Sequence, residues 1–350
     1  MAYTDIDNPE LYFQTKIFTG NENTLAVTFD GSENMQPDWV WIKNRADNYN
    51  HSLFDSVRGA TKRIASNATL AEATVAASLT AFNSNGFTLG NDTTSNAPNN
   101  SHVSWNWKAG GSASSNSNGT ITSSVSANTD AGFSIVSYTG NGSDNATIGH
   151  GLGSSIDFVI VKRRNTTSNW LVQGSKVGTG YGQYIELNAI NAIGSASDNI
   201  KSVSSSLLTL GTNGSCNGSS DTYIAYCFAE KKGYSKFGSY TGNGNNNGTF
   251  VYTGFKPAFV IVKNTAINEN WSMHDNKRND NVIPNYARLT PDDNQAEATN
   301  TTFAKVELFS NGFKLGNSAD VINDSGVEFI YMAFASNPLV TSTGVPTTAR

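Results

Sequence analysis

The chain has 350 residues, of which 37% are hydrophobic and 15% charged, and its formal net charge is -5. There is enough apolar material for packed cores, which excludes a disordered chain, and the mild acidity argues against nucleic-acid binding, which usually needs a basic surface. No apolar run approaches the roughly 18 residues of a membrane-spanning helix, and the acidic start lacks a signal-peptide pattern, so we expect no membrane insertion.

The predicted elements begin with an anchoring arm at residues 1–18 and a first unit at residues 19–110. This unit contains a Thr-Gly-Asn turn, an apolar strand that ends in a lysine, an asparagine followed by a ring, a Leu-Gly pair and a closing aromatic strand. These landmarks are Thr19–Asn21, Asp38–Lys43, Asn50-His51, Leu89-Gly90 and Val103–Trp107.

The same landmarks recur in the same order in a second unit at residues 132–232 and a third at 233–340. Five landmarks in three copies are hard to reach by chance, so we predict three related units. A linker rich in Gly, Ser and Asn (111–131) is expected between the first two, and a tail (341–350) after the third. The later copies are 139–141, 157–162, 169–170, 210–211 and 223–228, then 241–243, 258–263, 270–271, 315–316 and 329–334.

The pattern predicts β-structure throughout. Short runs of Val, Ile, Phe, Tyr and Trp are bounded by clusters of Gly, Asn, Ser and Asp, as in strands joined by tight turns. A repeat near 100 residues is too long for a solenoid and fits a complete small domain. The predicted fold class is therefore all-β, with tandem antiparallel β-sandwich or jelly-roll modules.

The apolar strands have a further consequence. Phe158–Val161 is four apolar residues in a row, whereas a strand with one wet face should alternate. Both faces must therefore be covered, the second one by a neighbouring unit, by the segment before the repeat or by another subunit. We expect a homo-oligomer.

Charged residues of the first and third units repeat as Asp-x-x-Arg, at Asp55/Arg58 and Asp275/Arg278, each with a glutamate downstream (Glu72 and Glu297). Glycoside hydrolysis needs two opposed carboxylates, which makes a glycosidase one interpretation. The other is that each Asp and Arg form a structural ion pair. We favour ion pairs, because a catalytic pair would seldom be copied intact into two units, and we expect no catalytic residues.

Aromatic residues divide into two groups. Trp105 and Trp107 alternate on one strand and are expected in a core. Trp170 and Trp271 follow polar loops, so we expect them to be exposed and to contact a glycan, together with His274 and Asp275.

No metal site or cofactor is expected, because the four histidines lack metal-type spacing and the Asn/Asp-rich loops lack a calcium pattern. The two cysteines, Cys216 and Cys227, make no disulfide framework, and both free thiols and a local bridge remain open.

Seven stretches of the chain carry a specific pattern: Gly132–Gly142, Gly149–Gly153, Tyr226–Glu230, Lys236–Gly244, Gly254–Phe259, Trp271 to Arg278 and the opening Tyr3 to Thr15. Together they resemble the repeated β-rich modules of marine tailed-phage virion proteins, and the resemblance covers nearly the whole chain. Such modules are usually described as concanavalin-A-like lectin/glucanase-type domains, fibres or surface structural proteins.

The resemblance implies a structural component of the virion, assembled in the host cytoplasm and exposed on the particle as a capsid decoration, head fibre or tail fibre. Its partners would be other virion proteins of the capsid or tail and, at the host surface, a glycan. The alternative is a virion-associated enzyme that degrades glycans. The family supplies no catalytic residues to carry over.

Overall fold

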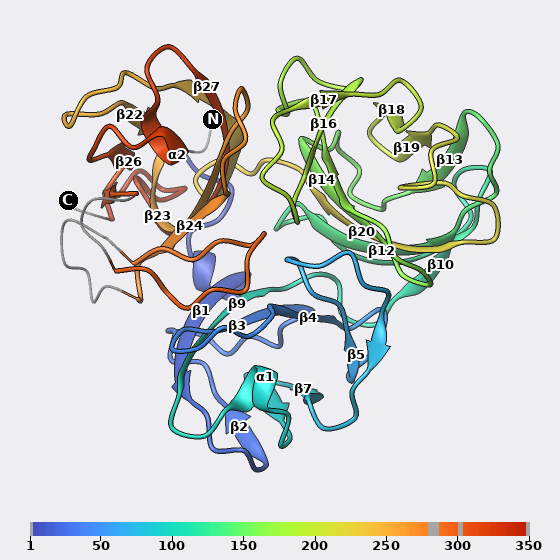
Figure 1. Ribbon diagram of the computed structural model, residues 1–350, viewed down its shortest axis with the longest axis horizontal. Coiled ribbons are helices and arrows are strands. Elements are labelled where there is room, and N and C mark those ends of the chain that lie inside the picture. Colours follow the sequence, from blue (N-terminus) through green and yellow to red (C-terminus); the bar gives the residue numbers. More distant parts are fainter. Residues whose placement is uncertain (1–2, 279–286, 300–303, 348–350) are drawn as a thin grey trace.

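The computed structural model describes residues 3–278, 287–299 and 304–347, and these residues form an almost entirely β structure (Figure 1). All strand pairs are antiparallel, apart from one isolated parallel bridge between Ile121 and Ile148. The all-β prediction is confirmed. Each of three units contributes one larger and one smaller sheet.

In the first unit, the larger sheet has the order β1-β9-β3-β4 and the smaller sheet the order β2-β8-β7. A short β5-β6 ribbon, the 3₁₀ turn η1 and the helix α1 complete the unit. The bounds are η1 (Pro9–Leu11), β1 (Phe13–Thr19), β2 (Leu25–Val27), β3 (Trp39–Asn44), β4 (Ser52–Asp55), β5 (Lys62–Arg63), β6 (Ala73–Thr74), β7 (Leu79–Asn83), β8 (Gly86–Leu89), α1 (Thr93–Asn96) and β9 (Ser101–Trp107).

In the second unit, the larger sheet has eight strands in the order β10-β11-β12-β20-β14-β15-β16-β17, and the smaller sheet has the order β13-β19-β18. The bounds are β10 (Ser114–Asn116), β11 (Ser123–Asn128), β12 (Phe133–Thr139), β13 (Ala146–Gly149), β14 (Phe158–Arg163), β15 (Trp170–Gln173), β16 (Gln183–Glu186), β17 (Gly194–Ser195), β18 (Ile200–Val203), β19 (Leu207–Leu210) and β20 (Thr222–Phe228).

In the third unit, the larger sheet has the order β21-β27-β23-β24 and the smaller the order β22-β26-β25. The bounds are β21 (Ser235–Thr241), β22 (Phe250–Tyr252), β23 (Phe255–Asn264), β24 (Ser272–Asp275), β25 (Val306–Phe309), β26 (Gly312–Leu315), α2 (Asp320–Asn323) and β27 (Glu328–Pro338). The order of this unit's larger sheet matches β1-β9-β3-β4 and the central strands β12-β20-β14-β15, so the three units share one arrangement.

The three units stand around a common centre, each with its larger sheet turned inward (Figure 1). Each unit has a core of its own between its two sheets. A fourth and larger cluster, here called the central core, draws residues from all three inward faces and contains all six tryptophans. A cavity of only about 10 Å³ remains among its rings, so the units meet in a packed contact.

The apolar strands explain this arrangement. Along β14, Phe158 and Ile160 belong to the central core, whereas Val159 and Val161 belong to the second unit's own core. The strands β3 and β23 alternate in the same way. Both faces are therefore covered, as expected. Sister units of the same chain form the second cover, so this run of residues is no argument for a second subunit.

The landmark turns are fastened by three asparagines that sequence reasoning did not single out. The Asn96 side chain accepts a hydrogen bond from the Asn21 backbone NH at 2.8 Å and donates one to the Gly90 carbonyl at 2.7 Å, joining the Thr-Gly-Asn turn to the Leu-Gly pair. Asn217 does the same in the second unit, and in the third unit Asn323 accepts from the Asn243 backbone NH and donates to the carbonyl of Asn317, next to the Leu-Gly pair. A Cβ on Gly20 would lie 2.1 Å from the Ala97 carbonyl oxygen, so glycine is required there.

Two domain boundaries were wrong. The expected arm (1–18) contains most of β1, which pairs with β9 along its whole length. The expected linker (111–131) contains β10 and β11, which extend the second unit's larger sheet. These Ser- and Asn-rich strands have low β propensity, and pairing with β12 outweighs it.

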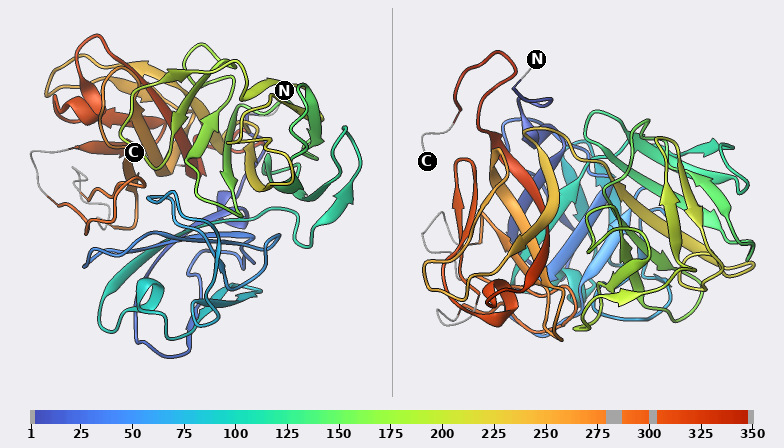
Figure 2. Two further views of the ribbon diagram at one scale, coloured as in Figure 1. Left: turned by 45° about the vertical axis from the view of Figure 1, so that its right-hand side comes forward. Right: turned by 90° about the horizontal axis from the view of Figure 1, so that it is seen from above.

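The two ends of the described chain lie together. Asp7 accepts hydrogen bonds from the backbone NH and the hydroxyl of Ser342, both at 2.6 Å, and Thr4 donates to the Lys232 carbonyl at 2.8 Å. In the right-hand view of Figure 2 both ends leave the body at one end of the molecule, and α2 lies at the other. The early residues are thus part of the body and contact the chain where the second unit meets the third.

Candidate functional site

The lysine that closes each apolar strand is buried and points to a neighbouring unit. Lys43 Nζ donates to the carbonyl of Asn294 in the third unit at 3.1 Å, and Lys162 Nζ to that of Thr69 in the first unit at 2.9 Å. Lys263 Nζ donates to the carbonyl of Ile190 in the second unit at 2.8 Å. Each unit therefore donates a lysine hydrogen bond to one neighbouring unit, and the three contacts together connect all three units in a ring.

The rings that follow the lysines make a second set of cross-unit contacts. Trp170 Nε1 donates to the Ala65 carbonyl of the first unit at 2.9 Å, and Trp271 Nε1 to the Glu186 carbonyl of the second unit at 3.0 Å. His51 Nε2 lies 2.9 Å from the Thr290 carbonyl oxygen of the third unit. These rings fill the joints between the units.

The expected glycan-contact residues were therefore wrong. Trp170 and Trp271 are 0% and 1% exposed, and His274 and Asp275 are both 0% exposed, so none can touch a sugar. His274 shares a hydrogen bond of 2.7 Å with the Ser272 hydroxyl, and burial holds its pKa well below the usual value. Polar flanking loops suggested exposure, but the neighbouring unit covers both rings.

The predicted ion pairs are confirmed. Arg58 Nε lies 2.5 Å from Asp55 Oδ2, and Arg278 Nε lies 2.5 Å from Asp275 Oδ2, with all four side chains buried. In each pair, the Asp Oδ1 atom also accepts a hydrogen bond from the arginine's backbone NH. The Asp-x-x-Arg spacing thus folds one turn onto itself, and local sequence was enough to predict it.

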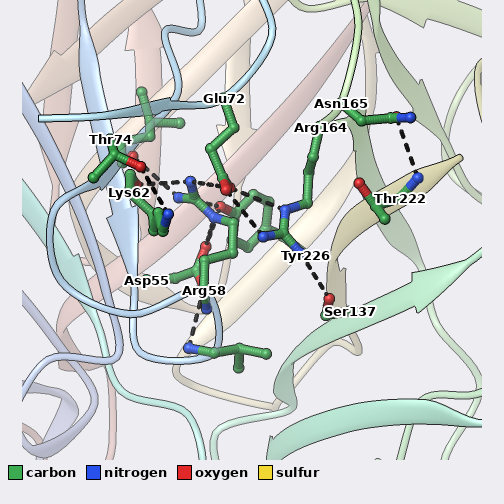
Figure 3. A network of polar contacts seen from close by, with 12 residues as sticks. Asp55, Arg58, Lys62, Glu72, Thr74, Ser137, Arg164, Asn165, Thr222 and Tyr226 are labelled. Carbon is green, nitrogen blue, oxygen red and sulfur yellow. Dashed lines mark hydrogen bonds and ion pairs between the residues drawn. The ribbon is translucent and has the colours of Figure 1, made fainter.

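Each pair is the centre of a larger cluster at a joint, as Figure 3 shows for Asp55 and Arg58. Glu72 accepts hydrogen bonds from Arg58 at 3.2 Å and from Arg164 of the second unit at 2.9 Å. Tyr226 of the second unit donates to Asp55 at 2.7 Å. Opposite charges are therefore matched across the boundary, which offsets the cost of burying them.

The same cluster recurs at the joint between the first and third units. Glu297 accepts from Arg278 at 3.0 Å and from Arg45 of the first unit at 2.7 Å, while Trp105 Nε1 donates to Asp275 at 2.9 Å. Arg45 and Arg164 each stand two residues after the landmark lysine, a repetition in the sequence that would have identified them.

The third joint, between the second and third units, lacks this cluster of charged residues. Gly174 and Val177 of the second unit take the places of the Asp and the Arg, and Met332 of the third unit takes the place of Tyr226 and Trp105 by sheet register. Val177 and Met332 both belong to the central core. Apolar residues of both units thus stand where the other two joints have an ion pair on one side and a Tyr or Trp hydrogen-bond donor on the other.

The electrostatics of the first cluster follow from its contacts. Burial would lower the pKa of Arg58, but Asp55, Tyr226 and Glu72 outweigh it and raise that pKa. Burial would raise the pKa of Glu72, but Arg164 and Arg58 hold it below the usual range. Arg58 and Glu72 are therefore both charged near neutral pH, and Glu72 is not poised to give or take a proton.

Two polar hollows lie outside the joints. One, of about 410 Å³, is lined largely by Ser, Asn and Gly from residues 110–118 together with Val125, Ala127 and Gly151. The other, of about 70 Å³, lies on the second unit and is called the unit 2 hollow below. It is lined by Asn169, Leu171, Tyr184, Glu186, Ala196, Asn199, Asn213 and Ser215.

Other chemical features are few. Cys216 and Cys227 are free thiols, and burial raises the pKa of each to about 12, so neither is a nucleophile near neutral pH. Over residues 3–278, 287–299 and 304–347, no three His, Cys, Asp or Glu side chains gather as a metal site would require. None of the helices described there is long and apolar enough to cross a bilayer.

Comparison with known proteins places this arrangement in a family. The model of a family described as "Domain of unknown function (DUF7483)" matches residues 8–338, and the chain therefore belongs to that family. Comparison with curated proteins and with solved structures gave no match.

Proposed function

We propose that this member of the family is a structural component of a tailed-phage virion, exposed on the particle surface as a capsid decoration, head fibre or tail fibre. It is assembled in the host cytoplasm, and its partners are other virion proteins. The proposal starts from the resemblance of the repeated motifs to virion modules, exemplified by Lys236–Gly244 and Gly149–Gly153.

The ring of cross-unit contacts is the observation that carries the proposal. Lys43, Lys162 and Lys263 are each buried against a neighbour, and the three inward sheets share one core. Such a body has little freedom to open, because moving one unit would uncover apolar faces and buried charges together. Rigidity of this kind suits a particle component that must keep its shape, and it does not suit an enzyme that opens around a substrate.

The two ends of the body differ, as expected for a protein that is attached to a particle at one end and exposed at the other. Residues near both ends of the described chain lie at one end, around Asp7 and Ser342. The Thr-Gly-Asn turns follow β1, β12 and β21 at the other end, and Asn23, Asn141 and Asn245 there are exposed. We infer that the first end faces the particle and the turns face outward, where host glycans would be met.

The alternative function, glycan cleavage, finds little support in the carboxylates that suggested it. Asp55 and Asp275 are buried against arginines, and Glu72 and Glu297 each accept from two arginines. A glycosidase needs one carboxyl group that carries a proton and a second that faces the sugar. We therefore expect the purified protein to release no reducing ends from host polysaccharide.

Antibody labelling of intact particles tests the proposal. Gold-labelled antibody raised against the purified protein should decorate purified virions at one defined location, on the head or on the tail. A matched antibody against a cytoplasmic phage enzyme is the control. If mass spectrometry of purified virions finds no peptide of this chain, the virion assignment fails whatever the protein binds.

The homo-oligomer expected from the sequence becomes a separate question for solution measurements. Its original argument is removed, since sister units cover the apolar faces of β3, β14 and β23. Light scattering of the purified protein at micromolar concentration distinguishes one chain from several.

A further inference from the structure

We propose that the unit 2 hollow binds one neutral pyranose ring of a polysaccharide. The hollow lies between β15, β16 and the loops at 196–199 and 213–215. This inference rests on the proposed function, since it names the ligand class that such a surface would meet. It concerns residues other than the buried set expected from the sequence.

The second unit extends its larger sheet more regularly at this edge than the other units do. β16 and β17 continue the sheet beyond β15, whereas beyond β4 and β24 the described residues pair only through isolated bridges, Leu53 to Ile64 and Met273 to Leu289. β16 carries both Tyr184 and Glu186 into the hollow's wall. The unit that lacks the Asp-x-x-Arg cluster therefore has the most regular strand pairing at this edge, and the hollow lies against it.

Asn199 supplies the strongest sign that the hollow receives a ligand. Its side chain is 2% exposed, and its Oδ1 atom accepts no hydrogen bond from any residue in the described part of the chain. A buried amide oxygen without a donor destabilises the folded state, because it has lost its hydrogen bonds to water and gained none in return. Because Asn199 lines the hollow, a ligand hydroxyl there could supply the donor.

The first unit shows what a purely structural residue looks like at this position. Ser78 corresponds to Asn199, since the backbone carbonyl of each accepts from the glycine of the Leu-Gly pair, at 2.8 Å from Gly90 and 2.6 Å from Gly211. The Ser78 hydroxyl is satisfied by the Ser95 hydroxyl at 2.8 Å. In the second unit Cys216 takes the place of Ser95. Its thiol lies 3.6 Å from the Asn213 carbonyl oxygen, and Asn199 Oδ1 is left without a donor.

The remaining wall has the chemistry of a sugar site. The Tyr184 ring is partly exposed and packs beside Gly194, where a Cβ would meet it at 2.9 Å. Asn169 donates to Glu186 Oε1 at 2.6 Å, and Asn213 donates to Asp198 at 3.3 Å. A ring beside amides and a carboxylate matches a pyranose, which has an apolar face and a rim of hydroxyls.

Charge sets the ligand class. In the described part of the chain no Lys, Arg or His lines this hollow, whereas Glu186 does. An anionic sugar or a phosphate would meet the Glu186 carboxylate without a compensating cation. A neutral hexose can donate hydroxyl hydrogens to Glu186 and to Asn199 Oδ1 and accept from Ser215. The preference for neutral over acidic sugars is therefore part of the proposal.

Ligand-observed NMR on the full chain tests the site. The probes are the methyl glycosides of glucose, galactose and mannose, N-acetylglucosamine, and glucuronate as the acidic counterpart. We expect millimolar binding of at least one neutral probe and none of glucuronate. Asn199→Ala should weaken binding about fivefold to tenfold, the value of one hydrogen bond. Ala196→Phe, which fills the hollow from a partly exposed position, should abolish it.

Two variants act as matched controls. Tyr252→Leu removes an exposed ring from the third unit, and Asn116→Ala removes an amide from the other polar hollow; both should bind as the parent does. The inference is overturned if no neutral probe binds the parent, if glucuronate binds equally well, or if folded Ala196→Phe retains binding. Particle labelling does not depend on sugar binding. A negative NMR result would therefore overturn the sugar site alone, and a negative labelling result would overturn the virion assignment alone.

Discussion

Tyr226 of the second unit donates its phenol hydrogen to the Asp55 carboxylate of the first unit at 2.7 Å, inside a joint that is closed to solvent. The same carboxylate oxygen lies 2.5 Å from Arg58 Nε. Asp55 therefore accepts hydrogen bonds from an arginine of its own unit and from a tyrosine of the neighbouring unit. Folding of the first unit and docking of the second depend on the same buried group.

Asp55→Ala should destabilise the protein by about 3–5 kcal/mol, because it leaves the Arg58 charge buried without its main partner. Urea unfolding followed by tryptophan fluorescence measures this, since all six tryptophans are in the central core. Asp30→Ala is the control; Asp30 is 57% exposed beside Lys16, and its loss should change stability by less than about 1 kcal/mol. Equal effects of the two variants would contradict a structural role for the cluster.

The apolar third joint predicts that replacing several residues of the first cluster together restores stability that Asp55→Ala alone would lose. Asp55→Gly, Arg58→Val and Tyr226→Met together convert the first joint to the residues of the third. Removing Asp55 and Arg58 together leaves Glu72 paired with Arg164 and so avoids an orphaned charge, and a well-packed apolar replacement of a buried ion pair is often nearly neutral. We expect the triple variant to be more stable than Asp55→Ala, by urea unfolding. A triple variant that is less stable than Asp55→Ala would show that the joints are not interchangeable.

Asp292→Asn should stabilise the protein at neutral pH. Asp292 accepts a hydrogen bond from the Trp271 backbone NH, a place held by Asn67 and Asn188 in the other units. Burial raises its pKa from 3.8 to about 6, despite the Asn270 hydrogen bond. The folded state keeps this proton to higher pH than the unfolded state, so stability falls as pH rises from about 4 to 6.

The shift in the pKa of Asp292 corresponds to about 3 kcal/mol, which is the upper limit of the gain at pH 7. Unfolding of both proteins at pH 4 and pH 7 measures it. The variant should be more stable than the parent at pH 7, and the difference should shrink at pH 4. A difference that is the same at both values would exclude titration of Asp292 as the cause.

Stability should rise between pH 8 and about 9.5. Burial lowers the pKa of Lys43, Lys162 and Lys263 from 10.5 to about 8. In this interval the unfolded chain holds more protons than the folded one, so raising the pH favours folding, by about 1–2 kcal/mol per lysine. Ionisation of Cys216 and Cys227 in the unfolded state opposes part of this rise, because burial raises their pKa to about 12 in the folded state. Above the interval the tyrosines oppose it too, because burial keeps the pKa of Tyr226 and Tyr240 well above 10.0.

Lys162→Met is the matched variant for this pH dependence. It should lower the rise in unfolding free energy between pH 8 and 9.5 by about 1–2 kcal/mol, leaving the contributions of the other two lysines. A parent protein whose urea midpoint is flat or falling over this interval would contradict the prediction.

A chain that ends at Lys232 should not form a stable monomer. Without the third unit, Trp105 and Trp107 lose their contacts with Phe259 and Phe334, whose ring centres lie 5.6–5.8 Å away. The uncovered apolar face should drive association or aggregation, visible by size-exclusion chromatography and dye binding. A soluble monomer with the parent's tryptophan emission would show that the units fold independently.

Local patterns predicted a good part of this molecule. The Asp-x-x-Arg spacing identified both ion pairs, because residues three apart in a tight turn meet whatever surrounds them. Four consecutive apolar residues at Phe158–Val161 indicated a strand with two covered faces, because alternate side chains on a strand point to opposite sides. The unit 2 hollow had no local signature, since Asn199 and Tyr184 come together only through the folding of separate strands.

The sequence by itself determined that the chain is all-β and which residues of each apolar strand are buried, because side-chain alternation and turn chemistry are local. Only the tertiary structure decided what covers them: Trp170 and Trp271 are buried because a neighbouring unit offers a backbone carbonyl to each. Residues 114–128, too polar to suggest strands, pair because β12 presents an open edge. Exposure and pairing depend on surfaces distant along the chain, and spacing within a segment carries no information about them.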